Sequence, residues 1–387
     1  MNVLFIMHNT DMYSGANLAM QEVIEELPSD ITKIILYPKS EGTAIEYFKN
    51  KGIKVITIPY WSLLLSETDT IIKNIIKYPL LLYRYFLMKI NCVKMNKMIK
   101  DIDIIYTNTS TIKFGLMLSV KYNIPHVWHI REFADKDHRL IFPLGKRHYY
   151  SLAKKKNSYL ITISECLKNE ILPYFNEEKV ALVYDNVQSG YINPNKKLNE
   201  KKDVNILIAG DIKEGKGQLI VVNAISILKK RGIKNINLFI AGKIGDRQYY
   251  NNIQNTIREN NINDIIHLLG HVTNMNELRR NMHIGVVASK SEAFGRVTVE
   301  GMLSNMAMIG RDTGATVELI ENNVTGILYD GSAMDLADKI ESLLDEKNRN
   351  KIANNGFKTA VELYASGSCS KKIAKILYKI NGEKRNG

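Results

Sequence analysis

Short apolar runs rich in β-branched residues alternate with longer helical patterns along almost the whole chain. Six runs lie in the first half, at 2–7, 32–37, 54–58, 103–108, 126–130 and 159–164. Six more lie in the second half, at 205–210, 237–242, 265–270, 283–289, 306–310 and 326–330. Apolar runs of this kind, each followed by a helical segment, predict parallel strands that helices cover on both faces. The alternation therefore predicts an α/β fold made of doubly wound layers.

A polar stretch interrupts the alternation once, between Tyr184 and Val204. It contains Gly190, Pro194 and several lysines, a composition typical of linkers. The 387 residues also exceed the length of roughly 250–300 at which a single core stops growing. We therefore predict two Rossmann-like domains with about six strands each. The predicted order is a first domain, a linker, a second domain and a terminal segment: 1–185, 186–202, 203–364 and 365–387.

The terminal segment begins with a break and continues as an amphipathic helix. Ile373, Ile376 and Leu377 follow the i, i+3, i+4 spacing of one helix face, and lysines occupy the other face. We expect this helix to pack back toward the first domain.

Basic residues are in excess, with 53 Lys and Arg against 40 Asp and Glu and a net charge of +13. Such a chain suits an acidic partner, which could be nucleic acid, an anionic bilayer or a phosphorylated small molecule. The three cysteines, Cys92, Cys166 and Cys369, lie far apart, so we expect neither a disulfide framework nor a zinc site. The N-terminus has no signal-peptide pattern, and no apolar run reaches about 18 residues. We expect a cytoplasmic protein that could also be peripheral on the inner face of the cell membrane.

Segment 71–100 contains seven basic residues and no acidic residue, among leucines, isoleucines and aromatic residues. A basic, apolar helix of this kind can lie in an anionic membrane interface, with its lysines reaching the headgroups. The alternative is a packed helix with a solvated basic face. Nucleic acid is not expected as the partner, because no recognition module is present.

Two glutamates, Glu292 and Glu300, lie eight residues apart at the start of a helical pattern that follows the apolar run 283–289. The N-terminal amides of a helix favour a phosphate, and Gly295 lets the backbone approach an anion closely. Ionised carboxylates accept hydrogen bonds from hydroxyls. The combination predicts a sugar-nucleotide site, although acidic residues also favour helix starts without any function.

The ordered motifs resemble those of the retaining, GT-B-fold glycosyltransferases of family 4, whose signature is a pair of glutamates eight residues apart. Here that signature is Glu292-Ala-Phe-Gly with Glu300. The other matching segments, in family order, are 14–27, 104–116, 126–133, 160–171, 208–218, 277–295 and 310–330. The resemblance covers nearly the whole chain. It implies two Rossmann-like domains that face each other across a cleft, a nucleotide-sugar donor, a hydroxyl acceptor, and neither a metal nor a cofactor.

The resemblance also assigns the donor-binding residues. Glu292 contacts the hydroxyls of the donor sugar, Glu300 holds the ribose, and Lys216 neutralises the diphosphate. A fixed cation there stabilises the charge that develops on the leaving nucleoside diphosphate. The distal phosphate is implied to bind the backbone amides of four successive residues: Phe294, Gly295, Arg296 and Val297.

Two residues of the first half are also implied in the reaction. Gly15 corresponds to a glycine turn that faces the donor phosphates or the acceptor, and His129 to a histidine beside the reacting sugar. Their alternatives are a plain turn and a hydrogen-bonded structural histidine. Arg131 and Glu132 follow on the same loop and could contact acceptor or donor, or only each other.

The chain departs from the family at Asp211, where many members have an arginine that completes a two-cation clamp on the diphosphate. Lys213 or Arg296 could supply the missing charge. Asp101 and Asp103 spell the D-x-D metal signature of the other large glycosyltransferase fold, but they precede an apolar run instead of following one. We therefore expect them to bind no metal.

The sequence thus predicts a metal-independent transferase that moves a sugar, with UDP as the default nucleotide, to a glycan or lipid-linked acceptor in cell-surface polysaccharide synthesis. Two alternatives remain. The chain could be a nucleotide-sugar epimerase of the same fold, or a membrane-associated partner that binds sugar nucleotides without catalysis.

Overall fold

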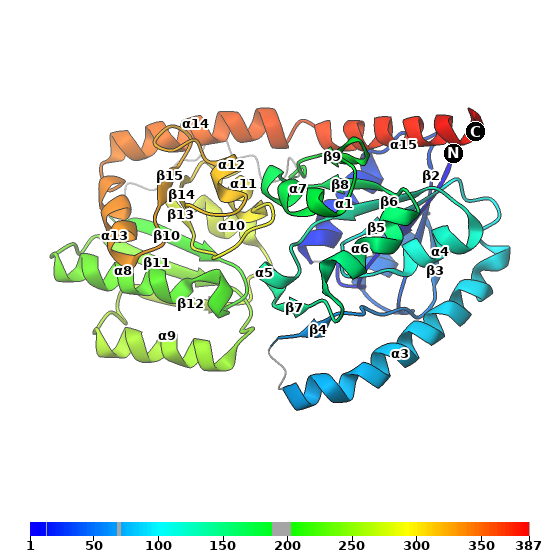
Figure 1. Ribbon diagram of the computed structural model, residues 1–387. Helices are drawn as coiled ribbons and strands as arrows, with labels where there is room; N and C mark the ends of the chain where they lie inside the picture. Colours follow the sequence, from blue (N-terminus) through cyan, green and yellow to red (C-terminus); the bar gives the residue numbers. More distant parts are fainter. Residues whose placement is uncertain (13, 68–70, 188–202, 387) are drawn as a thin grey trace. The chain divides into compact units, whose positions relative to one another are not determined.

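The computed structural model describes residues 1–12, 14–67, 71–187 and 203–386, and the chain divides into two compact units. The first unit contains Met1–Asn186 and Gly367–Gly387, and the second contains Val187–Ser366. Each unit has its own parallel sheet with helices packed on it (Figure 1). The chain therefore leaves the first unit once and returns to it.

The first unit is built on a seven-stranded parallel sheet with the order β3-β2-β1-β5-β6-β8-β9. Its strands are β1 (Asn2–Ile6), β2 (Thr32–Tyr37), β3 (Lys54–Thr57), β5 (Ile104–Asn108), β6 (His126–Ile130), β8 (Tyr159–Thr162) and β9 (Val180–Leu182). A two-stranded antiparallel pair, β4 (Leu65–Ser66) and β7 (Leu140–Ile141), lies beside it. The predicted parallel α/β fold is confirmed, and the seventh strand, β9, was not predicted.

Helices cover both faces of this sheet because successive side chains of each strand point to opposite sides. The helices of the first unit are α1 (Gly15–Glu26), α2 (Thr43–Asn50), α3 (Ile71–Lys94), α4 (Phe114–Tyr122), α5 (Asp135–His138), α6 (Gly145–Lys155), α7 (Glu165–Ile171) and α15 (Ser368–Asn386). Val3 and Phe5 of β1 belong to a core formed with α1, α2 and α15, whereas Leu4 and Ile6 belong to a core formed with α3 and α4. Short 3₁₀ helices are η1 (Met95–Lys97), η2 (Leu172–Tyr174) and η3 (Glu177–Lys179).

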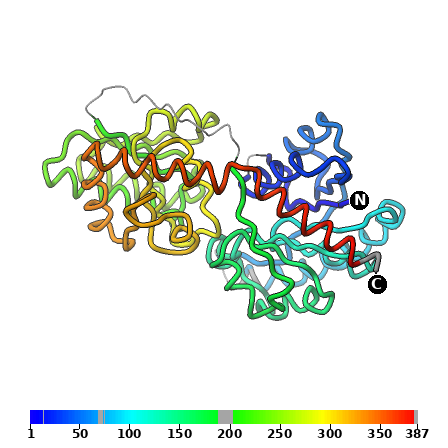
Figure 2. Tube along the Cα trace, turned by 90° about the horizontal axis from the view of Figure 1, so that it is seen from above, coloured from blue at the N-terminus to red at the C-terminus, as the bar shows by residue number. Residues whose placement is uncertain are grey.

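The terminal helix α15 belongs to the first unit and packs on α1. Its apolar residues Ile373, Leu377 and Ile380 are buried in the same core as Val3 and Phe5. Figure 2 shows this helix, in red, running along the unit that contains the N-terminus. The apolar stripe read from the sequence is therefore an internal surface of the first unit.

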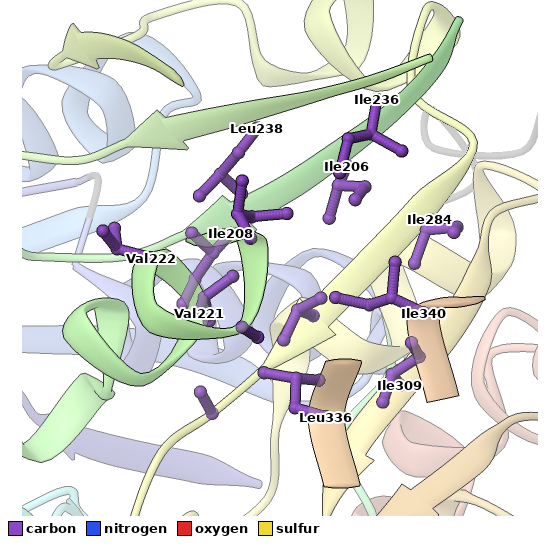
Figure 3. Packing of buried hydrophobic residues seen from close by; sticks show 14 of the residues in the cluster. Ile206, Ile208, Val221, Val222, Ile236, Leu238, Ile284, Ile309, Leu336 and Ile340 are labelled. Atoms are coloured by element: carbon purple, nitrogen blue, oxygen red, sulfur yellow. The ribbon is translucent and has the colours of Figure 1, made fainter. Parts of the chain in front are cut away.

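The second unit has a six-stranded parallel sheet with the order β12-β11-β10-β13-β14-β15. Its strands are β10 (Val204–Ala209), β11 (Ile236–Ala241), β12 (Ile266–Gly270), β13 (Ile284–Val287), β14 (Ala307–Arg311) and β15 (Ile327–Tyr329). Its helices are η5 (Glu214–Lys216), α8 (Gln218–Lys230), α9 (Arg247–Glu259), α10 (Met275–Arg280), α11 (Arg296–Leu303), α12 (Thr316–Leu319), α13 (Ala333–Ser342) and α14 (Glu346–Tyr364). Figure 3 shows Ile206 and Ile208 of β10 in one cluster with Val221 and Val222 of α8.

The order of strands reverses once in each sheet. The reversal lies between β1 and β5 in the first unit and between β10 and β13 in the second. Loops that leave the carboxyl ends of such neighbouring strands run in opposite directions and leave a crevice, where α/β proteins bind ligands. The two reversals therefore indicate where each unit binds its ligand.

The predicted linker 186–202 is described only at its first two residues. Asn186 and Val187 are buried, with 5% and 1% of their surface exposed, and the Val187 amide donates to the carbonyl of Tyr364 at 2.8 Å. These two residues are thus packed parts of the fold. The remainder, 188–202, lies outside the described residues.

Candidate functional site

Lys216 and Glu292 meet at the reversal point of the second sheet. Lys216 ends the short 3₁₀ helix η5 within the loop after β10, and Glu292 lies on the loop after β13. The two loops are joined by a backbone hydrogen bond of 3.0 Å from Lys290 to Gly215. The Nζ of Lys216 lies 2.6 Å from the Oε1 of Glu292. The strand order therefore brings together two residues 76 positions apart that the sequence assigned to one donor site.

Two glycines allow these loops to approach so closely. Gly217 has a φ of +74°, and a Cβ there would lie 2.3 Å from the carbonyl oxygen of Ala288. Gly314 has a φ of +57°, and a Cβ there would lie 2.7 Å from the carbonyl oxygen of Glu292. Both backbone conformations disfavour other residues, and both contacts exclude a side chain. The position of Glu292 is thus fixed from one side by the loop after β14 and from the other by Lys216.

The charge of Glu292 is maintained by its neighbours. Burial alone would raise the pKa of Glu292, but the charge and hydrogen bond of Lys216 outweigh it. Ser289 and the positive charge of Lys213 add to this effect, and the pKa of Glu292 falls below its usual value. The site therefore presents a carboxylate and an ammonium group side by side at neutral pH.

The N-terminus of α11 follows directly on the same loop. Its N-cap residue is Gly295, with a φ of +97°, which has no side chain to cap the first amides. Phe294 is buried against Tyr364, with the ring centroids 5.9 Å apart, and anchors this turn. The predicted amide set, Phe294 to Val297, therefore lies at the positive end of a helix, beside Lys216 and Glu292.

Glu300 lies one turn into α11 and is held by two arginines. Arg279, at the end of α10, donates from Nη2 to the Oε2 of Glu300, and the Nε of Arg296 lies 3.5 Å from the Oε1. All three side chains are largely buried. The guanidinium of Arg296 thus pairs with Glu300, whereas the charge of Lys213 acts on Glu292. The charge of Lys213, one of the two predicted substitutes for the missing family arginine, thus acts on the Lys216–Glu292 pair.

Asp211 itself is exposed, and its carbonyl oxygen accepts a hydrogen bond of 3.0 Å from Gln218 Nε2. Its backbone therefore helps to shape the loop that carries Lys216.

The ring of His129 is fully buried in the first unit. Its Nδ1 lies 2.6 Å from the hydroxyl of Tyr106 and 3.2 Å from Nη2 of Arg131. Burial, followed by the positive charge of Arg131, lowers the pKa of His129 well below its usual value, so the ring is neutral. Arg131 in turn binds both carboxylate oxygens of Asp185, at 2.5 and 2.7 Å. This environment suits a residue that positions Arg131 better than one that touches a sugar, and direct contact of His129 with the donor stays a prediction.

The carboxyl edge of the first sheet also holds a strained turn. Thr109 has a φ of +83°, which is rare for a β-branched residue and is typical of functional turns. Glu132 accepts hydrogen bonds from both the amide and the hydroxyl of Ser110, at 2.5 and 2.7 Å, and the indole of Trp128 donates to the Thr109 carbonyl. Glu132 thus stabilises the turn instead of forming an ion pair with Arg131.

Gly15 is the first residue of α1 and is exposed. A Cβ at this position would meet no heavy atom within 4 Å, so the described fold does not require glycine here.

His8, which follows β1 on the same edge of the sheet, was not identified from the sequence. Burial, followed by the charges of His138 and Arg131, lowers the pKa of His8 to about 4.

Arg279 was also not identified from the sequence, because two arginines at the end of a short helix are typical of a solvated helix face. The burial of an arginine can be recognised only when the position of its carboxylate partner is known. Asp101 and Asp103 precede β5 at the amino edge of the sheet, where the Asp101 carbonyl and the Asp103 carboxylate accept hydrogen bonds from Asn2. No group of three or more His, Cys, Asp or Glu in the described ranges could hold a metal ion.

Two Rossmann-like units with parallel sheets, the second carrying a lysine–glutamate pair at its reversal point, are the architecture of the GT-B class of glycosyltransferases. Residues 192–359 match the family described as glycosyl transferases group 1. The second unit therefore matches a glycosyltransferase domain, and the chain as a whole has the GT-B fold.

Three similar proteins illustrate the match. An uncharacterized glycosyltransferase of Methanocaldococcus jannaschii, MJ1178, is 25% identical over 74% of this chain and 79% of its own length. The capsular polysaccharide biosynthesis glycosyltransferase CapM of Staphylococcus aureus is 26% identical over 54% of this chain and 58% of its own. The crystal structure of Anabaena Alr3699/HepE in complex with UDP and glucose superposes with a TM-score of 0.78, at 18% identity, over 97% of this chain and 99% of that one.

Proposed function

We propose that this enzyme is a retaining, metal-independent transferase of the family 4 type. It transfers a sugar from a UDP-sugar to a hydroxyl of a glycan or lipid-linked acceptor in cell-surface polysaccharide synthesis. The observation that carries the proposal is the Lys216–Glu292 pair at the reversal point of the second sheet. The HepE complex with UDP and glucose supports the donor class, and the name of CapM supports the product class.

The donor would be held by four groups of the second unit. Lys216 and the amides at the start of α11 bind the diphosphate, because both present positive charge at the loop after β13. Glu292 accepts hydrogen bonds from sugar hydroxyls, and Glu300 accepts them from the ribose. As the glycosidic bond breaks, negative charge develops on the leaving diphosphate. A preorganised ammonium group and amides stabilise that charge more in the transition state than in the ground state.

Retention needs no separate protein base in this proposal. The bond from the anomeric carbon to the diphosphate oxygen breaks, and the acceptor oxygen bonds to the same face. The leaving diphosphate oxygen takes the acceptor proton. The chain's own contribution is to orient the sugar through Glu292 and to neutralise the diphosphate through Lys216 and the α11 amides.

Transfer of labelled sugar from UDP-sugars to lipid extract tests this function. We expect transfer by the natural chain and a loss of about tenfold to a hundredfold in Glu292→Gln, since a hydrogen bond to a charged group contributes about 1.5–3 kcal/mol. Glu214→Gln is the matched control, because Glu214 lies on the loop that carries Lys216 but is about half exposed. Binding without turnover would support the non-catalytic alternative. Interconversion of free UDP-sugars would support an epimerase.

Membrane attachment is the second part of the proposal, and it rests on α3. The face of α3 that packs on the first unit includes Met88 and Cys92, whereas the opposite face exposes a stripe of large apolar residues. Their exposed fractions range from 39% to 70%: Ile75, Ile76, Leu82, Tyr83, Phe86, Ile90 and Val93. The helix lies along one side of the first unit (Figure 1). The outward face of α3 therefore carries a stripe of apolar side chains, and lysines of the same helix, such as Lys89 and Lys94, are exposed as well.

The charge around this stripe favours an anionic bilayer as the occupant. Segment 71–100 has a net charge of +7, from seven basic residues and no acidic residue. Apolar side chains at the acyl boundary with lysines at the headgroups are the pattern of interfacial helices. No helix in the described ranges is long and apolar enough to cross a membrane.

Flotation with vesicles tests this part. We expect binding that rises with the fraction of anionic lipid and falls at least about threefold in Leu82→Ser, because roughly 1.5–3 kcal/mol of burial is lost with a leucine side chain. Leu363→Ser is the control, since Leu363 is 51% exposed on the second unit. Binding that is indifferent to anionic lipid, or equally reduced in both variants, would contradict the membrane proposal.

A further inference from the structure

Arg279 reaches Glu300 from a different helix and is more deeply buried than its partner. Only 3% of the Arg279 side chain is exposed, against 10% for Glu300. Its guanidinium donates to Oε2, and the Nε of Arg296 lies 3.5 Å from Oε1, so each carboxylate oxygen has one arginine. Each oxygen of a carboxylate has about two lone-pair sites, so each still has an accepting position left. The two arginines thereby fix the orientation of the Glu300 carboxylate, and both of its oxygens can still accept hydrogen bonds from a ligand.

Because Arg279 is buried, it restricts the orientations that the Glu300 carboxylate can adopt. A carboxylate beside a helix start can swing between several rotamers unless a neighbour holds it. The N–H groups of a planar guanidinium point in fixed directions, so the buried Arg279 side chain restricts where Oε2 of Glu300 can lie, whereas an ammonium group rotates freely. The neighbouring Arg280 on the same helix is exposed to solvent. Only one arginine of the pair is therefore placed to act on the site.

We propose that Arg279 is a positioning residue that orients the Glu300 carboxylate toward the ribose hydroxyls of the donor. The inference rests on the proposed role of Glu300. It extends that role to a side chain on α10, outside the glutamate motif. Without Arg279 the carboxylate would still be present, but it would no longer be held in the orientation that meets two adjacent hydroxyls.

The test compares the affinities of UDP and 2′,3′-dideoxy-UDP by titration calorimetry. For the natural chain we expect UDP to bind about tenfold to a hundredfold more tightly, the range that hydrogen bonds to a charged acceptor supply. In Arg279→Met the preference should fall below about threefold, while the affinity for the dideoxy nucleotide stays within about threefold. A purely structural loss would weaken both nucleotides alike. Arg280→Met is the control and should keep the full preference.

Two more variants keep the outcome decisive. Arg279→Lys retains the positive charge next to Glu300 and should fold even if Arg279→Met does not. The logarithm of its affinity ratio between UDP and the dideoxy nucleotide should still be at most half that of the natural chain. Glu300→Gln tests the role on which the inference rests. If Glu300→Gln keeps the preference, the ribose role of Glu300 is wrong. If Glu300→Gln loses it and both Arg279 variants keep it, Glu300 binds ribose and Arg279 does not position it.

Discussion

The coupling between Lys216 and Glu292 is open to direct measurement, because the same two loops carry a second ion pair of equal length. Lys216 Nζ and Glu292 Oε1 are 2.6 Å apart, as are Lys290 Nζ and Glu214 Oε1. The side chains of the first pair are 29% and 16% exposed, and those of the second are 52% and 51% exposed. The two ion pairs thus have the same N–O distance and differ in how far their side chains are buried. A double-mutant cycle should give about 1–2 kcal/mol for the first pair and roughly 0.3 kcal/mol for the second.

The cycle uses the Lys→Met and Glu→Gln single and double variants of each pair, unfolded in urea. Circular dichroism follows both units, whereas the two tryptophans, Trp61 and Trp128, lie in the first unit and report on it alone. The tryptophan signal therefore identifies the transition that the substitutions should leave unchanged. Equal coupling energies for the two pairs would refute the argument that burial strengthens the Lys216–Glu292 contact.

The same variants give a second prediction, on the direction in which the affinity for UDP changes. In the free enzyme Lys216 is bound to Glu292, so the diphosphate must compete for the ammonium group. Glu292→Gln should therefore bind UDP at least as tightly as the natural chain while transfer falls. Lys216→Met should bind UDP about tenfold to a hundredfold more weakly, since a charge-assisted contact is lost. Equal UDP affinity in the natural chain and Lys216→Met would show that Lys216 does not contact the diphosphate.

Gly314→Ala should destabilise the enzyme by about 1–3 kcal/mol and weaken donor binding, because the new Cβ would lie 2.7 Å from the Glu292 carbonyl. Gly232→Ala has the same left-handed backbone but no neighbour within 4 Å, and should lose stability without losing donor affinity. Burial raises the pKa of Glu132 from 4.5 to about 7. The free energy of unfolding should therefore fall by about 3 kcal/mol as pH rises from 4.5 to 7, and this component should be missing in thermal melts of Glu132→Gln. Gly15→Ala should change the melting temperature little but raise the KM if residue 15 faces a substrate, and an unchanged KM would remove it from the site.

The fold class could be predicted because parallel strands buried on both faces leave a strong apolar signal. Strand β9 escaped because it has three residues, Val180–Leu182, inside a short apolar run at the edge of the sheet. Strand order was beyond the sequence pattern, and it is the order β10-β13 that brings Lys216 to Glu292. The family motif could name these two residues but not their contact.

The burial of individual polar residues was the second feature that could not be predicted from the sequence. Arg279 and His129 look like ordinary polar residues in the sequence, and their roles depend on which side chains surround them. For α3 the count of basic residues was correct, but only packing shows that Met88 and Cys92 face inward and leave Leu82 and its neighbours outside. Periodicity gives a helix two faces without saying which one is covered.

The place of α15 in the first unit has a consequence for biosynthesis. The buried residues of α15, among them Ile373, Leu377 and Ile380, complete a core whose remaining members precede residue 186, so ribosomes synthesise the whole second unit before that core can close. During this interval the nascent first unit exposes the apolar surface of α1 and its neighbours that α15 will cover. A chain that stops at residue 366 would keep this surface exposed for good, whereas the second unit, with all its strands contiguous, can fold while it is being made. The first half of the chain is thus the last to finish folding.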